Sequence, residues 1–170
     1  EHHDVEVVVQ RCDQAAVHDA LCARWELFCL DPPGEGWRSW SGHPLRPPAF
    51  QLQARWATFE FDIFTETAET TETAETTETG QTTENPDRAT WYFRRDRRIS
   101  RPLADVTTIG VGGLPIVRPE VQLLYMARST EPKHRHDFET AAPRLDPAAA
   151  EWLATALTTT AHGHPWLQQW

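Results

Sequence analysis

A hexapeptide repeat in the middle of the sequence limits which residues can build a folded core. Residues 65–82 read Thr-Glu-Thr-Ala-Glu-Thr twice and then Thr-Glu-Thr-Gly-Gln-Thr, with no apolar side chain larger than that of alanine. Such a segment buries too little apolar surface to offset an ordering cost of about 1–2 kcal/mol per residue. We therefore expect residues 65–87 to be a disordered acidic insert in a hairpin loop. A cation- or partner-binding acidic arm is the alternative.

The insert also carries most of the negative charge of the chain. The formal net charge is −9, and seven acids lie from Glu66 to Asp87 with no Lys or Arg among them, which leaves −2 for all other residues. The folded part is therefore nearly neutral, and we expect no nucleic-acid partner. A chain of 170 residues suits a single domain, and we predict one over residues 1–170.

Cysteine usage and hydropathy indicate a cytoplasmic protein. Cys12, Cys22 and Cys29 are odd in number and lack CxxC spacing, which favours reduced thiols over a disulfide framework. No run of about 18 apolar residues is present, so no membrane partner is expected. No basic-then-apolar leader opens the sequence. The oligomeric state is not indicated by any of these patterns.

The segment before residue 50 has the pattern of a strand, a helix and a second strand. The β-branched run of residues 5–9 predicts a short buried strand that ends at Gln10. Asp13 is typical of a helix N-cap, and apolar residues at spacings near three and four predict a helix after it. Residues 25–30 return to strand character, and the Pro- and Gly-rich residues 31–48 predict a loop.

Apolar runs on both sides of the insert predict further strands. Residues 50–56 and 59–64 are separated by only two residues, and residues 91–93 follow the insert. We expect all three to belong to one sheet.

The last third of the chain has the pattern of a short strand and two helices. A Gly-rich turn at residues 109–113 precedes a predicted strand at residues 114–117, and Pro119 fits the first position of a helix to about Arg128. Asp146-Pro147 repeats this start signal for a helix through Leu157. The whole pattern predicts an α/β (α+β) fold with a small mixed sheet and helices toward the C-terminus.

Two of the predicted strands carry acids on one face. Residues two apart in a strand point the same way, so Asp4 and Glu6 project together, and so do Glu60 and Asp62. Either strand alone is typical of a solvated sheet face. Two such strands together favour a divalent cation that neutralises the cluster, because Mg²⁺ prefers carboxylate oxygens together with substrate phosphates. A two-metal arrangement would suit phosphoryl displacement.

Several motifs follow one another in order outside the insert. They are His3-Asp4-Val5-Glu6-Val7, Trp91-Tyr92-Phe93-Arg94-Arg95-Asp96 with Arg101-Pro102-Leu103, Arg118-Pro119-Glu120-Val121-Gln122-Leu123-Leu124-Tyr125, Lys133 with Asp137-Phe138, and His164-Pro165-Trp166-Leu167. In this order and spacing the chain resembles the aminoglycoside adenylyltransferase-like nucleotidyltransferases. The resemblance implies a nucleotidyltransferase fold.

The resemblance also assigns roles to the carboxylates. Asp4 and Glu6 would hold Mg²⁺ on the nucleoside triphosphate, and ATP would be the substrate. Asp62 would be the third carboxylate, as a metal ligand or as the base for a substrate hydroxyl, and Glu60 is the alternative for that position.

Three residues downstream of the insert would contact nucleotide or substrate. They are Lys133, Asp137 and Arg94. Arg94 belongs to a cluster with Arg95, Arg97, Arg98 and Arg101, for which ion pairing with Asp96 and the acidic insert is the alternative.

The activity implied by the resemblance is transfer of AMP from ATP to a hydroxyl of a small, aminoglycoside-like acceptor. The Gly-Gly helix start that precedes the acidic pair in this family is absent before Asp4, and Met126 and His134 replace charged residues of the relatives. These departures favour an alternative, an N-terminally truncated copy that is a catalytically inactive remnant or binding module. A zinc-binding domain built on the paired histidines is a third hypothesis.

Overall fold

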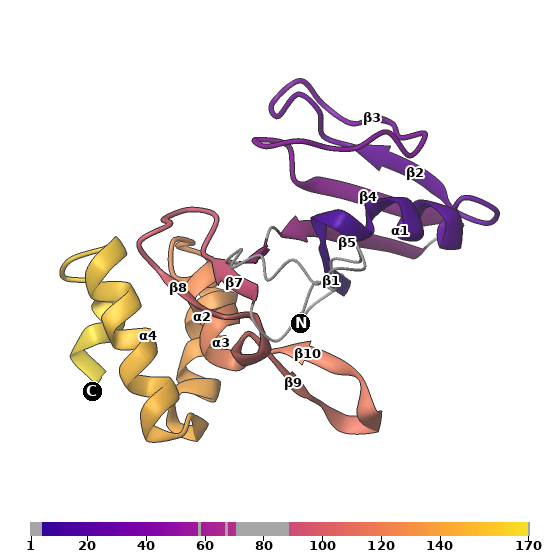
Figure 1. The fold of residues 1–170 in the computed structure, drawn as a ribbon. Helices are drawn as coiled ribbons and strands as arrows, with labels where there is room; N and C mark the ends of the chain where they lie inside the picture. Colours follow the sequence, from indigo (N-terminus) through magenta and orange to yellow (C-terminus); the bar gives the residue numbers. More distant parts are fainter. Residues whose placement is uncertain (1–4, 58, 67, 71–88, 170) are drawn as a thin grey trace, which may run out of the picture. The chain divides into compact units, whose positions relative to one another are not determined.

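The computed structural model describes residues 5–57, 59–66, 68–70 and 89–169, and it divides the chain into two compact units, residues 1–68 and 69–170 (Figure 1). Within the described residues there are four α-helices and small β-sheets, so the fold is mixed α+β, as predicted. That the two units act as one domain stays a prediction. No helix in these ranges is long and apolar enough to cross a membrane.

The first unit is built on a five-stranded sheet with the order β1-β5-β4-β2-β3. The strands are β1 (Val5–Gln10), β2 (Glu26–Cys29), β3 (Arg38–Ser39), β4 (Gln51–Trp56) and β5 (Phe59–Glu66). Strand β1 runs parallel to β5, and the other neighbouring pairs are antiparallel. The sheet is therefore mixed, and the strands predicted near residues 5–9, 25–30, 50–56 and 59–64 are confirmed.

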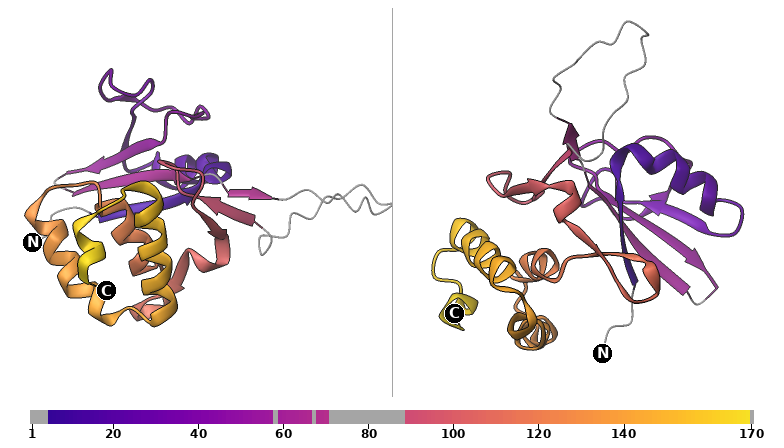
Figure 2. Two further views of the ribbon diagram at one scale, coloured as in Figure 1. Left: turned by 90° about the vertical axis from the view of Figure 1, so that its left-hand side faces the viewer. Right: turned by 60° about the horizontal axis from the view of Figure 1, so that its bottom comes forward.

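One face of this sheet forms the core of the first unit. Leu27, Leu52 and Ile63 are buried there, and helix α1 (Gln14–Leu21) packs against this face through partly buried apolar residues (Figures 1 and 2). Buried Gln14 joins the helix to the loop between β3 and β4: its Oε1 accepts a hydrogen bond from the Leu45 backbone N–H at 2.8 Å, and its Nε2 donates to the Leu45 carbonyl at 3.3 Å. The opposite face of the sheet carries the polar side chains of β1, β4 and β5.

The prediction that the first strand is buried is wrong. Val5 of β1 is 54% exposed, and Val7 and Val8 are exposed as well. Strand β1 is the outermost strand in the sheet order, so it pairs on one side only, and among its valines Val9 packs against the core. A β-branched run predicts a strand well, but it cannot show whether the strand lies at the edge of its sheet.

The second unit contains two further small sheets and three helices. Strands β6 (Ala68–Thr70), β7 (Ala89–Tyr92) and β8 (Ser100–Pro102) form one sheet, and β9 (Thr107–Ile109) pairs with β10 (Pro115–Val117) in an antiparallel hairpin. The helices are α2 (Pro119–Met126), α3 (Pro132–Ala141) and α4 (Pro147–Thr160). The short 3₁₀ segments of this unit are η3 (Leu103–Asp105), η4 (Val111–Gly113), η5 (Ala142–Arg144) and η6 (Pro165–Gln169), and η1 (Arg11–Asp13) precedes α1 in the first unit.

Two predictions about the region around the insert need correction. The strand at residues 91–93 does not join the sheet of residues 50–64, because β7 pairs with β8 in a separate sheet. The start of the repeat is not a disordered loop, because β5 continues to Glu66 and β6 spans Ala68–Thr70. The alternating Thr and Glu residues allow a strand to continue where it has a neighbour to pair with. Residues 71–87 of the predicted insert lie outside the described residues.

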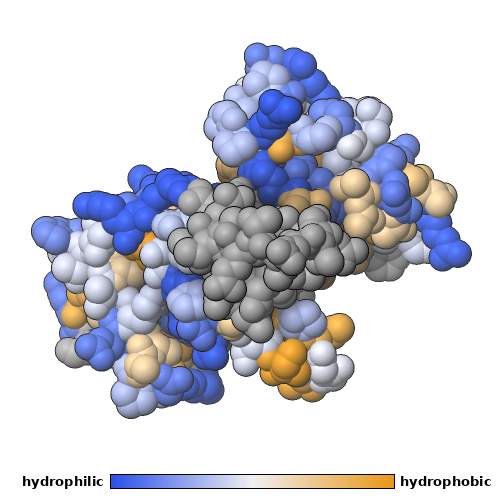
Figure 3. Space-filling view, in the orientation of Figure 1, coloured by the Kyte–Doolittle hydropathy of each residue, from blue (hydrophilic) through white to orange (hydrophobic). Residues whose placement is uncertain are grey.

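The core of the second unit lies among its three helices (Figure 2). Leu124 of α2, Phe138 of α3 and Leu153 of α4 are fully buried in it, together with Trp91 of β7 and Trp166 of η6. The β9–β10 hairpin has the opposite character. It exposes an apolar tip, visible as the orange patch over the hairpin in Figure 3, that consists of Ile109, Val111, Leu114 and Ile116.

All three helices of this unit begin with proline, and one of them has a side-chain cap. Asp146 precedes Pro147 and accepts a hydrogen bond from the Ala149 N–H at 2.8 Å through Oδ1. The prediction of a helix start there is confirmed. Asp13 also occupies the residue before a helix, but its side chain makes no capping hydrogen bond.

This contrast gives a test of the cap. Asp146→Ala is expected to lower the free energy of unfolding by about 1 kcal/mol, because it leaves the first-turn N–H groups of α4 without their acceptor. Asp13→Ala is the matched control and should change it by less than about 0.5 kcal/mol. Urea unfolding of both variants measures the difference. Equal losses would show that the Asp146 hydrogen bond contributes nothing specific.

Candidate functional site

Two predicted ligands lie side by side in the first unit. Glu6 of β1 and Asp62 of β5 are register partners in the parallel strand pair. Neighbours in register on adjacent strands project from the same face, and here that face is opposite the core. Glu6 is exposed and Asp62 is half-buried. The strand pairing therefore brings together two carboxylates that are 56 positions apart in sequence, Glu6 and Asp62.

Asp62 is oriented by a buried amide on the next strand. Gln53 of β4 is the register partner of Asp62, and its Nε2 donates a hydrogen bond to Asp62 Oδ1 at 3.1 Å. Gln53 is only 4% exposed. No sequence motif pointed to this residue, although a polar side chain inside the apolar run of residues 50–56 was a signal for it. The other carboxylate oxygen of Asp62 makes no hydrogen bond to the described residues.

The two other predicted carboxylates are Asp4 and Glu60. Asp4 lies outside the described residues. Glu60 belongs to β5, two residues before Asp62 and in register with Arg55 of β4. The guanidinium of Arg55 lies 4.9 Å from the centre of the Phe28 ring. The predicted acidic face thus also carries a cation two register positions from the Gln53–Asp62 pair.

The chemistry of the two adjacent carboxylates suits a hard divalent cation. Mg²⁺ is commonly held by one or two protein carboxylates and completes its octahedral shell with water and phosphate oxygens. Glu6 and Asp62 supply that number of carboxylates. Within residues 5–57, 59–66, 68–70 and 89–169, no group of three or more His, Cys, Asp or Glu side chains is arranged to hold a metal ion.

The three predicted nucleotide- or substrate-binding residues lie in the second unit. Lys133 is exposed in the first turn of α3, as expected for a lysine at a helix start, and its Nζ is 3.6 Å from the Glu131 carboxylate. Asp137 follows one turn later and is half-buried. Arg94 follows β7, and its guanidinium lies 4.7 Å from the centre of the Tyr125 ring.

The arginine cluster forms an ion pair with Asp96, which was the predicted alternative to a contact with substrate. Arg98 pairs with Asp96 at 2.6 Å, and this hydrogen-bonded guanidinium lowers the pKa of the Asp96 carboxyl below its ordinary value. Arg101 makes a pair that the sequence did not reveal, with Glu120 of α2 at 3.0 Å. Arg98 and Arg101 are therefore engaged by carboxylates of the second unit.

The histidines of the zinc hypothesis are engaged in different ways. His164 uses both ring nitrogens, with Nε2 donating to the Ala127 carbonyl at 2.8 Å and Nδ1 accepting from the Trp166 backbone N–H at 3.2 Å. His162 Nδ1 contacts the Thr158 carbonyl. Because His162 and His164 contact different backbone groups, their rings do not converge on one point. Both side chains serve local backbone contacts.

Comparison with protein-family models, with curated proteins and with solved structures finds no match to this chain. The resemblance to nucleotidyltransferases therefore stays a prediction.

Proposed function

We propose that this chain carries a nucleotidyltransferase site that transfers AMP from ATP to a hydroxyl of a small acceptor. The observation that supports the proposal is the register of β1 and β5, in which Glu6 and Asp62 are direct neighbours on the polar face of the sheet. Two adjacent carboxylates repel each other, and a bound divalent cation relieves that repulsion. The resemblance of the sequence motifs suggests the reaction, and the strand register supports Glu6 and Asp62 as the proposed ligands of the cation.

Each residue of the site has a proposed role. Glu6 is a metal ligand, and Asp62 is either the third ligand or the base that accepts the proton of the acceptor hydroxyl. Mg²⁺ bound at these carboxylates would neutralise charge on the triphosphate. Gln53 is a positioning residue, because its amide fixes one oxygen of Asp62, and the other oxygen has no partner among the described residues. Asp4 and Glu60 would complete the carboxylate set.

The sequence resemblance assigns the contacts to nucleotide and acceptor to three residues that belong to the second unit. Lys133 offers a compact ammonium for phosphate, and Arg94 offers a guanidinium that the Tyr125 ring holds in place. Asp137 would attract a cationic acceptor. An acceptor with several amines, as in an aminoglycoside, suits the negative charge of the proposed site.

A transfer assay tests this proposal. The full chain is incubated with Mg²⁺, ATP labelled at the α-phosphorus and a panel of amino-sugar and polyol acceptors, and labelled product is counted. The unaltered chain should label at least one acceptor. Asp62→Asn should lower the rate by about 100-fold or more, because a general base contributes that much to proton transfer.

Glu26→Gln is the matched control, since Glu26 is an exposed acid of the same sheet on β2. It should transfer AMP at the unaltered rate. An Asp62→Asn variant that transfers equally well would contradict the assigned role. An unaltered chain that binds Mg²⁺ and ATP but labels no acceptor would contradict the enzyme and favour the non-catalytic binding module.

A further inference from the structure

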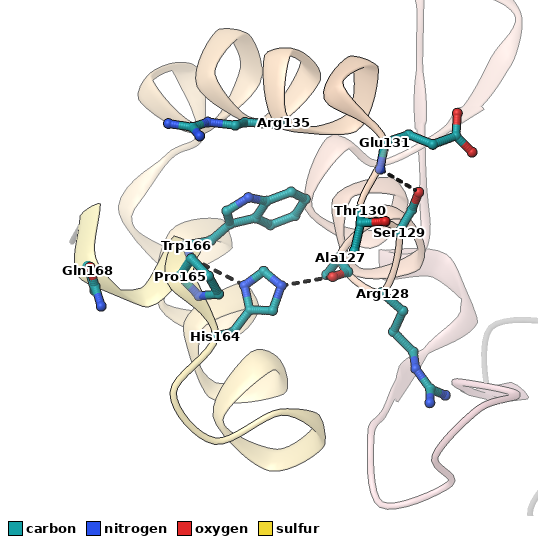
Figure 4. A pocket seen from close by; sticks show the side chains of 10 residues that line it. All are labelled: Ala127, Arg128, Ser129, Thr130, Glu131, Arg135, His164, Pro165, Trp166 and Gln168. Atoms are coloured by element: carbon teal, nitrogen blue, oxygen red, sulfur yellow. Dashed lines mark hydrogen bonds between the residues drawn. The ribbon is translucent and has the colours of Figure 1, made fainter.

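A pocket in the second unit lies apart from the proposed carboxylate site. It is bounded by the loop between α2 and α3, by α3 itself and by the C-terminal segment η6, and it has a volume of about 530 Å³ (Figure 4). Its polar lining includes Arg128, Ser129, Arg135 and His164, and Trp166 forms its inner wall. We propose that this pocket binds the oxyanion group, phosphate or carboxylate, of a small organic molecule.

The indole of Trp166 is the buried part of this site. Trp166 is only 7% exposed, and its ring stacks on Phe138 with a centroid distance of 4.2 Å and an interplanar angle of 9°. Trp166 lines the pocket, and its Nε1–H has no acceptor in the part of the chain that the structure describes. Figure 4 shows the nitrogen on the edge of the indole toward Arg135. This nitrogen is not among the buried side-chain atoms that lack a partner, so it is open to water and available to a ligand.

Arg135 adds a charged donor on the same side. Its Nε donates to Glu139 Oε1 at 2.8 Å, one turn along α3. The two terminal nitrogens make no hydrogen bond within the described ranges, and the side chain is 75% exposed. A guanidinium with both terminal nitrogens available matches the two oxygens of a carboxylate or phosphate. Arg135 and Trp166 together therefore present an N–H donor set with one positive charge.

His164 holds the wall of the pocket and does not compete for the ligand. A carbonyl can only accept and a backbone N–H can only donate, so the contacts to Ala127 and Trp166 require a neutral ring with the proton on Nε2. Both nitrogens are then used. The ring also packs edge-on against the Trp166 indole at 5.0 Å, which keeps the indole in place.

The charges around the pocket favour an anion over a cation. Glu131 is the one carboxylate among the described lining residues; it lies within 3.6 Å of Lys133 Nζ, and in Figure 4 its carboxylate points away from Trp166. Arg128 and Arg135 both line the pocket, but in Figure 4 the Arg128 guanidinium also points away from Trp166, so the preference for an anion rests on Arg135. The volume lies within the range of small-molecule sites, so the ligand can carry an organic body in addition to its oxyanion.

The indole signal of Trp166 gives a direct test with the full chain. In ¹⁵N-labelled protein it is one of eight tryptophan indole resonances, and Trp166→Phe identifies it by its loss. Inorganic phosphate and acetate are titrated separately at constant ionic strength, with sodium chloride as the reference. We expect a saturable shift of this signal, with half-saturation at about 10 mM or below, a range typical of weak small-ion binding. Saturation with phosphate, with acetate or with both identifies the oxyanion accepted.

Arg135→Gln separates the site from a general salt effect. Because Arg135 is exposed, this variant should fold normally, and loss of a charge-assisted contact should raise the dissociation constant about tenfold or more. Arg144→Gln, an exposed arginine after α3, should leave the constant unchanged. The proposal is overturned if neither anion shifts the Trp166 signal beyond sodium chloride, or if Arg135→Gln binds with the unaltered constant.

Discussion

Replacing Glu120 by alanine is expected to lower the free energy of unfolding by about 3–5 kcal/mol. Glu120 is 2% exposed in the first turn of α2, and its carboxylate accepts a hydrogen bond from Arg101 Nη1 at 3.0 Å. Arg101 is itself largely buried, with its guanidinium 4.6 Å from the centre of the Trp152 ring. Removing the carboxylate leaves a positive charge in the interior without a counter-ion, which is a large cost.

Urea unfolding measures this loss, and two further variants show its origin. Glu139→Ala breaks the exposed Arg135–Glu139 pair and should cost about 1 kcal/mol or less. The double variant Glu120→Met, Arg101→Leu removes both charges and should regain most of the stability lost in Glu120→Ala. A Glu120→Ala protein that loses no more than Glu139→Ala would contradict the account of a buried ion pair between β8 and α2.

Phe138→Ala is expected to lower the free energy of unfolding by about 3–5 kcal/mol as well. Phe138 is fully buried in the helical core and stacks on the Trp166 ring. Alanine would leave a cavity beneath the indole that the surrounding helices cannot fill completely. Phe138→Leu keeps most of the volume and should cost about 1.5 kcal/mol or less.

Val111→Ala is the control for this series, because Val111 is fully exposed at the tip of the β9–β10 hairpin. It should change the free energy of unfolding by no more than about 0.5 kcal/mol. Denaturant titration of the three variants ranks them. If Phe138→Ala is no less stable than Phe138→Leu, the cavity explanation is wrong.

Local patterns in the sequence predicted most strands and helices but not their neighbours. The alternation of residues 59–64 predicted β5, and Pro119 and Pro147 marked the first residues of two helices. The same patterns could not show that β7 belongs to a different sheet from β4 and β5, because pairing depends on contacts between distant segments. The exposure of Val5 follows from strand order in the same way.

Buried polar residues were the hardest feature to predict. Glu120, Gln53 and Gln14 are ordinary surface types, yet each is buried with a partner from another element. The partner of Gln14 is the backbone of Leu45, 31 positions away, and no local pattern identifies it. Such residues become buried because a specific hydrogen bond offsets their desolvation, and that bond exists only in the folded chain.

The candidate carboxylate site was partly predictable because it depends on strand periodicity. The two-residue spacing of Asp4 and Glu6, and of Glu60 and Asp62, predicted that each pair shares a face. The sequence could not supply the register that sets Glu6 beside Asp62, nor the amide of Gln53 that orients it. The pocket lined by Trp166 was missed, because its donors come from a loop, a helix and the C-terminal segment.

Calorimetric titration of Mg²⁺ with a non-hydrolysable ATP analogue examines the proposed role of the Glu6–Asp62 pair most directly. It is performed on the unaltered chain, on the Glu6→Gln, Asp62→Asn double variant and on the Glu26→Gln control. The proposal predicts that the unaltered chain and the control bind alike, and that the double variant binds at least about tenfold more weakly, because two anionic carboxylates become neutral amides. Equal binding by all three proteins would contradict the assignment of Glu6 and Asp62 as metal ligands.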